Sequence, residues 1–198
     1  CIIPARYAST RLPGKPLRDI AGKPMIVRVY ERAVRAKLVQ DVVVATDDER
    51  IRAAVEEYGG RAVMTRIDHA TGTDRLAEVA EKMTDYDLII NVQGDEPLID
   101  PAVIDALVEP FLADETLPMA TAKTLLTDEE EMTNPNNVKV ITDLSGNALY
   151  FSRARIPYAR NEGAKVYKHI GIYAYRRDFL LAYARMAQTP LERSESLE

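Results

Sequence analysis

The chain has 198 residues, 46% of them hydrophobic, and its 26 basic and 31 acidic side chains give a formal net charge of −5 at pH 7. This size suits a single folded domain, and the acidic balance argues against broad binding to nucleic acid or to a membrane surface, which needs a net basic face. The single cysteine excludes an internal disulfide framework and a cysteine-based zinc cluster, and it suits a reducing compartment such as the cytoplasm. No apolar run approaches the roughly 18 residues that a membrane-spanning helix needs.

Apolar patterns predict alternating strands and helices over the first half of the chain. Val42, Val43 and Val44 form a β-branched run that is typical of a strand buried on both faces, and apolar residues three and four positions apart predict helices. In chain order we expect a strand at 1–5, a helix at 23–36, a strand at 41–46, a helix at 47–58, a strand at 61–65, a helix at 74–83, a strand at 87–92 and a helix at 101–112. This alternation is typical of the α/β class with a doubly wound, mostly parallel, Rossmann-like sheet.

The second part of the chain is richer in strands. We expect strands at 119–125, 138–143, 148–152 and 166–175, a hairpin turn at 144–147 and a helix at 179–186. The acidic run 128–131 is interpreted as the start of a solvated helix. Ser194 with the acidic residues after it is also interpreted as a helix start, so we expect a further C-terminal portion to follow residue 198. The predicted organisation is one domain over 1–198, with an α/β core at 1–117 and a β-rich insertion at 118–176.

The loop after the first strand concentrates positive charge. Residues 6–23 contain a single acidic residue, Asp19, and five basic residues: Arg6, Arg11, Lys15, Arg18 and Lys23. Guanidinium groups match phosphate oxygens in pairs, and an ammonium group adds a point charge. The loop lacks the spacing of a P-loop. It is predicted to bind a polyphosphate, and a solvated basic loop is the alternative.

Two further segments follow or precede predicted elements at the edge where α/β sheets bind ligands. Asp95 comes directly after the strand at 87–92, where its carboxylate could hold Mg²⁺ together with substrate phosphates or merely cap the next helix. The segment 69–75 contains small residues that let the backbone approach a ligand, and a helix N-terminus accepts anions. Simple capping by Thr73 or Asp74 explains that segment equally well.

The β-rich part carries a third set of polar side chains. Arg153 lies in the segment 151–157, and His169 and Tyr173 lie in the segment 167–173. A guanidinium group with an imidazole and a phenol could bind a small carboxylated and hydroxylated molecule. Ordinary hydrogen bonding within strands is the alternative.

Five segments occur in an order that resembles one known family: IPARYASTRLPGKPL, HATGTDRLAEV, NVQGDEP, ALYFSRARIPY and HIGIYAYRR. They are similar to the 3-deoxy-manno-octulosonate (Kdo) cytidylyltransferases, the CMP-Kdo synthetases of lipopolysaccharide biosynthesis, along the whole chain. The resemblance implies a nucleotidyltransferase that moves CMP from CTP to Kdo with Mg²⁺ and releases pyrophosphate in the cytoplasm. It also implies a homodimer that assembles through the β-rich part, where Ile170, Ile172 and Tyr175 would supply apolar contacts.

The resemblance assigns roles residue by residue. The catalytic residues would be Arg11, Lys15 and Asp95, with Asp95 as the Mg²⁺ ligand. The residues that contact the nucleotide would be Ala5, Arg6, Arg11, Lys15, Thr71, Gly72, Thr73 and Arg75. The residues that contact the sugar would be Gln93, Arg153, His169 and Tyr173. In the family, a second Mg²⁺-binding aspartate follows beyond the position of residue 198.

Two other hypotheses stay open. The acceptor could be another acidic sugar, such as 8-amino-Kdo or a sialic acid, and the spacing of residues 153–173 does not distinguish these sugars. The protein could instead be a nucleotide-binding module without catalysis. Pyrophosphate release is the observation that separates this module from an enzyme.

Overall fold

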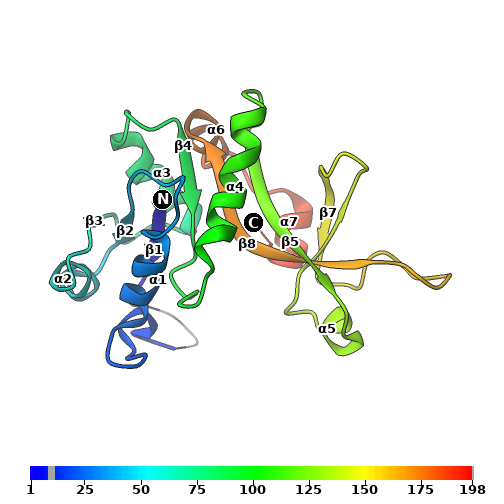
Figure 1. Ribbon diagram of the computed structural model, residues 1–198, viewed down its shortest axis with the longest axis horizontal. Helices are drawn as coiled ribbons and strands as arrows, with labels where there is room; N and C mark the ends of the chain where they lie inside the picture. Colours follow the sequence, from blue (N-terminus) through cyan, green and yellow to red (C-terminus); the bar gives the residue numbers. More distant parts are fainter. Residues whose placement is uncertain (9–11, 198) are drawn as a thin grey trace. The chain divides into compact units, whose positions relative to one another are not determined.

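The structure, a computed structural model, describes residues 1–8 and 12–197 (Figure 1). Contacts divide the chain into two compact units. The first consists of Cys1–Ala120 and Ile172–Arg185, and the second of Thr121–Gly171 and Met186–Glu198. This division differs from the predicted core at 1–117 and insertion at 118–176, because residues 172–176 pair with a strand of the first unit.

The first unit alternates strands and helices as the sequence predicts. Its elements are β1 (Ile2–Ala5), the 3-10 helix η1 (Lys15–Leu17), α1 (Met25–Ala33), β2 (Val43–Thr46), α2 (Glu49–Glu57), β3 (Ala62–Met64), α3 (Gly72–Lys82), β4 (Leu88–Asn91), α4 (Pro101–Ala113), the end of β8 (Val166–Arg176) and α6 (Arg177–Tyr183). Each strand and helix expected up to residue 112 is present, with shifted ends.

The sheet of the first unit is mostly parallel. Its strands lie in the order β3-β2-β1-β4-β8. β1 pairs in parallel with β2 and β4, β2 pairs in parallel with β3, and β8 runs antiparallel to β4 with Tyr175 opposite Ile89. Parallel neighbours require a crossover, which the helices between the strands supply. The predicted doubly wound α/β class is confirmed.

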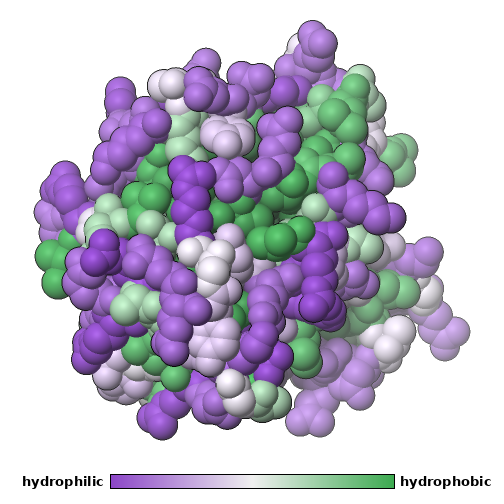
Figure 2. Space-filling model, turned by 60° about the vertical axis from the view of Figure 1, so that its left-hand side comes forward, coloured by the Kyte–Doolittle hydropathy of each residue, from purple (hydrophilic) through white to green (hydrophobic). Residues whose placement is uncertain are grey.

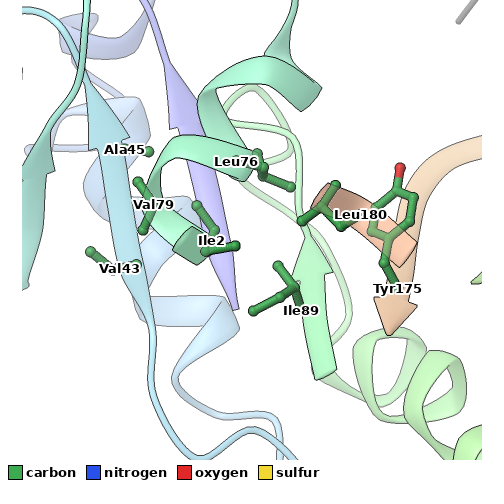
Figure 3. Packing of buried hydrophobic residues seen from close by; sticks show 9 residues of the cluster. Ile2, Val43, Ala45, Leu76, Val79, Ile89, Tyr175 and Leu180 are labelled. Atoms are coloured by element: carbon green, nitrogen blue, oxygen red, sulfur yellow. The ribbon is translucent and has the colours of Figure 1, made fainter. Parts of the chain in front are cut away.

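One face of this sheet is covered by α3 and α6 (Figure 3). The buried cluster on this face comprises Ile2, Val43, Ala45, Leu76, Val79, Ala80, Ile89, Tyr175 and Leu180. Ile3 and Val44 alternate with Ile2 and Val43 along their strands and are fully buried, so they face the opposite side of the sheet. Both faces are therefore closed to water, as a parallel sheet requires.

Two residues expected at a dimer interface belong to this core instead. Ile172 is 1% exposed and Tyr175 is 2% exposed. Tyr175 packs within the cluster under α3 and α6. The expectation that these two side chains supply dimer contacts is wrong, because both are already buried within the chain itself. Ile170, in the second unit, is half-buried.

The second unit is built around antiparallel strands. It contains most of β5 (Met119–Leu126), α5 (Glu129–Thr133), β6 (Lys139–Thr142), β7 (Ala148–Ser152), the first part of β8 and α7 (Pro190–Glu195). β6 pairs antiparallel with β7 and with β8, and β5 also pairs with β8. The predicted hairpin turn is present: the Asp143 carboxylate accepts hydrogen bonds from the N–H groups of Ser145 (2.9 Å) and Asn147 (2.8 Å).

The last helix begins before the position that the sequence analysis gives. Thr189 and Glu192 form a capping box at the start of α7, and Pro190 occupies its first turn. The helix ends at Glu195, and Ser196 has a left-handed backbone with φ 49°. The predicted helix start at Ser194 is wrong, because the threonine, proline and glutamate at 189–192 are the stronger start signal.

The surface shown in Figure 2 carries hydrophilic side chains over most of its area, with smaller hydrophobic patches between them. Across the residues that the structure describes, no helix is long and apolar enough to cross a membrane.

Candidate active site

A cleft of about 340 Å³ lies at the carboxyl ends of β1 and β4. These strands are parallel neighbours, so the loops that follow them meet at one edge of the sheet. The described residues that line the cleft are Pro4, Ala5, Arg6, Ala8, Lys15, Pro16, Met25, Gln93, Gly94 and Asp95. The structure thus brings together side chains from two of the segments that the sequence analysis singled out, the basic loop and the segment 91–97.

Gly94 allows the two loops to approach each other. A Cβ atom at this position would lie 2.6 Å from the carbonyl oxygen of Pro4, closer than real Cβ contacts allow. Gln93 and Asp95 flank this glycine, so the close approach holds both of them beside the end of β1.

Lys15 is presented by the short helix η1. Gly14 precedes it with φ 70°, in the left-handed region that favours glycine. The Gly14 N–H donates to the carbonyl oxygen of Tyr7 (2.9 Å), and the Tyr7 ring lies 3.4 Å from the guanidinium carbon of Arg50. These contacts fix Tyr7 and Gly14 relative to each other and orient Lys15 toward the cleft. Arg11, a predicted catalytic and nucleotide-binding residue, lies outside the described residues.

Lys15 and Asp95 form an ion pair across the cleft. The distance between Lys15 Nζ and Asp95 Oδ2 is 2.6 Å, and the side chains are 39% and 50% exposed. Exposed pairs of this kind contribute only about 0–1 kcal/mol. A ligand can therefore separate the two groups at little cost: a phosphate would attract Lys15, and a cation would attract Asp95. Arg6 is exposed at the same cleft and adds a second positive charge.

The donor set at Asp95 fits Mg²⁺ only together with a substrate. No group of three or more His, Cys, Asp or Glu side chains that could hold a metal occurs among the described residues. Mg²⁺ commonly binds one or two carboxylates and completes its shell with water and substrate phosphates. Asp95, half-exposed in a cleft that also holds Arg6 and Lys15, matches that arrangement.

The segment 71–75 begins α3 and lies beside β1. Asp74 N–H donates to Thr71 Oγ1 (3.1 Å) and Thr71 N–H donates to Asp74 Oδ2 (3.0 Å), which makes a capping box. A Cβ at Gly72 would lie 3.8 Å from Pro4 Cγ, so this helix start adjoins the end of β1. Thr73 is buried. The segment does cap α3, but the N-cap is Thr71, with Asp74 as its partner, and not Thr73. The predicted nucleotide contacts of Thr71, Gly72 and Thr73 stay a prediction.

Arg75 lies away from the lining of the cleft. Its side chain is fully buried, and its guanidinium donates to Asp47 Oδ2 (3.0 Å) and to Thr65 Oγ1. Asp47 follows β2 and Thr65 follows β3, so Arg75 joins the ends of two strands to α3. These contacts give Arg75 a structural role, and its predicted contact with the nucleotide stays a prediction.

Sequence reasoning missed the hydrogen-bonded contact between His69 and Glu78. His69 Nε2 lies 2.6 Å from Glu78 Oε2, and the same carboxylate oxygen accepts the Arg66 N–H (2.9 Å). Burial raises the pKa of Glu78, but hydrogen bonds from the Arg66 backbone, His69 and Lys82 outweigh it and lower the pKa to about 2. The pair attaches the loop before α3 to the helix itself. The sequence signal that could have predicted this contact is a histidine just before a predicted helix, with a glutamate within that helix.

The predicted sugar-binding residues are divided between the two units. Gln93 and Tyr173 belong to the first unit, and Arg153 and His169 belong to the second. Tyr173 lies opposite Asn91 in the sheet, and its ring stacks on Tyr175 with centroids 5.9 Å apart.

His169 is a half-buried, uncharged side chain. Its ring packs edge-on against Phe151 with centroids 4.8 Å apart, and Nε2 lies 2.9 Å from Thr121 Oγ1. Burial lowers the pKa of His169 to about 4. At pH 7 the imidazole is therefore neutral and can act only as a neutral hydrogen-bonding group.

Arg153 is half-buried, and its guanidinium contacts main-chain carbonyl oxygens. Nε donates to Glu195 O (2.7 Å), Nη1 to Pro135 O (3.0 Å) and Nη2 to Ser196 O (3.2 Å). All of these residues belong to the second unit.

Comparisons with known proteins show the family to which this chain belongs. A family model described as cytidylyltransferase matches residues 1–198. The chain is 54% identical to the 3-deoxy-manno-octulosonate cytidylyltransferase of Geobacter metallireducens, covering 100% of this chain and 82% of that protein. It is 56% identical to the Fusobacterium nucleatum protein of the same name, covering 100% of this chain and 80% of that protein.

Solved structures agree with these sequences. The structure of a CMP:2-keto-3-deoxy-manno-octonic acid synthetase complexed with CTP matches with a TM-score of 0.95 and 51% identity, over 99% of this chain and 81% of that one. A cytidylyltransferase from Leptospira borgpetersenii matches with a TM-score of 0.59 and 22% identity, over 97% of this chain and 66% of that one, and shares the fold. The chain is therefore a nucleotidyltransferase of the cytidylyltransferase family and belongs among its 3-deoxy-manno-octulosonate cytidylyltransferases.

Proposed function

We infer that this protein transfers CMP from CTP to Kdo, giving CMP-Kdo for lipopolysaccharide biosynthesis and releasing pyrophosphate. The observation that carries the inference is the cleft at the ends of β1 and β4, where Arg6 and Lys15 face Asp95. The identity of more than half of the residues to relatives named for this reaction supports the choice of donor and acceptor.

The reaction joins an acceptor hydroxyl to the α-phosphorus of CTP. The anomeric hydroxyl of Kdo forms the new P–O bond and loses its proton, and the bond between the α-phosphorus and the bridging oxygen breaks as pyrophosphate leaves. Transfer of this kind depends mostly on positioning and on stabilising the spread negative charge. Arg6 and Lys15 bind the phosphates in this proposal and offset the charge that leaves with pyrophosphate, and Arg11 is proposed as a third cation.

Asp95 is the proposed ligand of Mg²⁺. A bound Mg²⁺ would stabilise charge on the phosphates and make the acceptor hydroxyl a better nucleophile. With Asp95 holding a cation, the Lys15 ammonium would be available to the phosphates. In this proposal the two groups of the Lys15–Asp95 ion pair separate when each contacts its own substrate group.

The remaining site residues orient the two substrates. Ala5 and the segment Thr71, Gly72, Thr73 are proposed to frame the cytidine through their backbone, and Gln93 is proposed to lie near the sugar. Arg153 binds the Kdo carboxylate in this proposal, while His169 and Tyr173 bind hydroxyl groups. Because the pKa of His169 is lowered to about 4, this contact does not depend on a positive charge at neutral pH. A homodimer and a location in the cytoplasm are also part of the proposal.

Pyrophosphate release by the full chain with CTP and Mg²⁺ tests the proposal. Kdo, 8-amino-Kdo and N-acetylneuraminate are offered separately as acceptors, and UTP and ATP replace CTP as controls. We expect release with CTP and Kdo alone. Release with a different acceptor would correct the sugar, and CTP binding without release from any acceptor would identify a binding module instead.

A further inference from the structure

Lys139 is an unusual feature of the second unit because its side chain is completely buried. Its ammonium donates to the carbonyl oxygens of Asn134 (2.9 Å), Asn137 (2.6 Å) and Arg153 (2.6 Å). These bonds use all of the hydrogens of the ammonium group. Burial and the nearby charge of Arg153 lower the pKa of Lys139, and Glu195 opposes that change. A buried cation is costly unless it is fully hydrogen-bonded, so its position is strongly determined.

Glu195, the last residue of α7, binds the end of β7 and the residue that follows it, Arg153. Its carboxylate accepts hydrogen bonds from Tyr150 OH (2.7 Å), Ser152 Oγ (2.8 Å) and the main-chain N–H of Arg153 (2.6 Å). These contacts lower the pKa of Glu195, with the Arg153 backbone bond as the largest cause, so the carboxylate is ionised at neutral pH.

Arg153 is therefore fixed at its main chain and at its guanidinium. Glu195 holds its N–H, Lys139 holds its C=O, and neutral carbonyl oxygens of Pro135, Glu195 and Ser196 orient its guanidinium. A guanidinium has five N–H groups, and only some of them are used by these bonds. Among the described residues, no carboxylate oxygen accepts from this guanidinium. The nearby carboxylate of Glu195 interacts with the charge of Arg153 but accepts its hydrogen bond from the main-chain N–H. The guanidinium is therefore oriented by neutral carbonyl oxygens, and its remaining N–H groups can donate to an external anion.

We propose that Lys139 and Glu195 are positioning residues that hold Arg153 in place for the carboxylate of the acceptor sugar. This role rests on the proposed transfer to Kdo. A guanidinium that is already oriented can bind a carboxylate through two parallel hydrogen bonds without first losing its own conformational freedom. Neither residue touches the sugar in this scheme; both act through Arg153. The network therefore affects recognition of the acceptor and leaves recognition of CTP unchanged.

The test compares KM values for the two substrates in the full-length enzyme. Glu195→Gln keeps the size of the side chain and removes the charge that accepts the three hydrogen bonds. We expect the KM for Kdo to rise about tenfold, as loss of charge-assisted hydrogen bonds implies, while the KM for CTP stays within about twofold. Glu195→Asp keeps the carboxylate and should recover part of the loss. Glu130→Gln, an exposed glutamate of α5, is the matched control and should leave both KM values unchanged.

A second variant tests the buried cation. Lys139→Met leaves the carbonyl oxygens of Asn134, Asn137 and Arg153 without their donor, so its thermal unfolding is measured beside its kinetics. Exposed Lys165→Met is its control. If Lys139→Met does not fold, Glu195→Gln decides the question alone.

The outcomes separate this inference from the function on which it rests. A selective rise in the KM for Kdo supports it. Equal changes in both KM values, or lower thermal stability with unchanged KM values, would show a structural network only and overturn it. A wild-type enzyme that releases no pyrophosphate with Kdo would overturn the proposed function and this inference together.

Discussion

Single side chains at the end of β4 determine what the cleft can hold. Gly94 passes so close to Pro4 O that no side chain fits at this position, and Asp95 is consequently held at the rim of the cleft opposite Lys15. The sequence analysis predicted that Lys15 binds phosphate groups and that Asp95 binds Mg²⁺. It could not predict that they contact each other, because the contact joins residues 80 positions apart.

Replacement of Asp95 tests its proposed role as metal ligand. Asp95→Asn should lower the rate of pyrophosphate release by at least about 100-fold, because an amide oxygen carries no charge to hold Mg²⁺. The change in the free energy of unfolding should stay below about 1 kcal/mol, since the pair with Lys15 is exposed. Turnover assays and urea unfolding of the same preparation measure both effects. Activity close to that of the wild type would contradict the metal role.

Replacement of Lys15 tests the electrostatic contact with the triphosphate. Lys15→Ala should weaken CTP binding, and the deficit should grow as the salt concentration falls, because screening by salt weakens a charge interaction. Titration calorimetry at several salt concentrations measures this slope. Lys37→Ala, an exposed lysine of the same unit, is the control. A deficit that does not depend on salt would indicate a folding defect.

At the scale of elements, the start of α3 is fixed by contacts that the sequence analysis underestimated. The capping box closes the first turn, the His69–Glu78 pair holds the preceding loop, and Arg75 joins this turn to the ends of β2 and β3. Capping by Thr71 can be predicted from a threonine and an aspartate three positions apart, although the sequence analysis gave Thr73 or Asp74 as the cap. The burial of Arg75 cannot, because it depends on how three separate elements meet.

Replacement of Arg75 separates its structural contacts from a nucleotide contact. Arg75→Met should destabilise the protein by about 3 kcal/mol, because it leaves the carboxylate of Asp47 without its buried partner. Arg66→Met, which removes an exposed pair with Asp68, should leave the stability almost unchanged. Urea unfolding measures both values. Unchanged stability in Arg75→Met, together with weaker CTP binding, would favour the predicted nucleotide contact.

Most elements were predictable because their apolar patterns are strong. The β-branched strands and the helices between them have periods that differ clearly, so the order of the first unit follows from the sequence. The start of the last helix was predicted at Ser194 because this serine is followed by acidic residues, as at many helix starts. The helix in fact begins after Thr189, so Ser194 lies inside it. Local signals of similar strength compete at such a position, and only the three-dimensional contacts decide between them.

At the scale of the whole molecule, the division of the chain was the hardest feature to predict. Residues 172–176 return to the first unit because β8 pairs with β4, and residues 186–198 join the second. Both assignments depend on contacts between segments far apart in the chain, and a single sequence does not show which distant segments meet. The same limit explains why Ile172 and Tyr175 were assigned to an interface between subunits when they are core residues.

The two units should contribute separately to the acid sensitivity of the protein. The pKa of His169 is lowered from 6.5 to about 4, so below pH 6.5 the unfolded chain takes up a proton that the folded protein excludes. The free energy of unfolding should therefore fall by up to about 3 kcal/mol between pH 6.5 and 4, with no contribution above that range. The pKa of Glu78 is lowered from 4.5 to about 2. Its contribution to the free energy of unfolding is therefore lost as the pH falls from 4.5 to about 2.

Urea unfolding across this pH range measures both contributions. His169→Gln should flatten the upper part of the profile, and Glu78→Gln should flatten the lower part. A wild-type profile that does not change between pH 6.5 and 4 would contradict the burial of a neutral imidazole.

In the ion pair between Lys15 and Asp95, each side chain competes with the ligand proposed for the other. Each group neutralises the other, so a nucleotide must displace Asp95 from Lys15, and a cation must displace Lys15 from Asp95. Any ligand that breaks the pair prepares the site for the second, and such coupling is reciprocal. If Asp95 holds a divalent cation as proposed, we expect positive cooperativity between CTP and that cation. In the absence of any divalent cation, Asp95→Asn should bind CTP more tightly than the wild type, by up to about fivefold, since a pair of this exposure contributes at most about 1 kcal/mol.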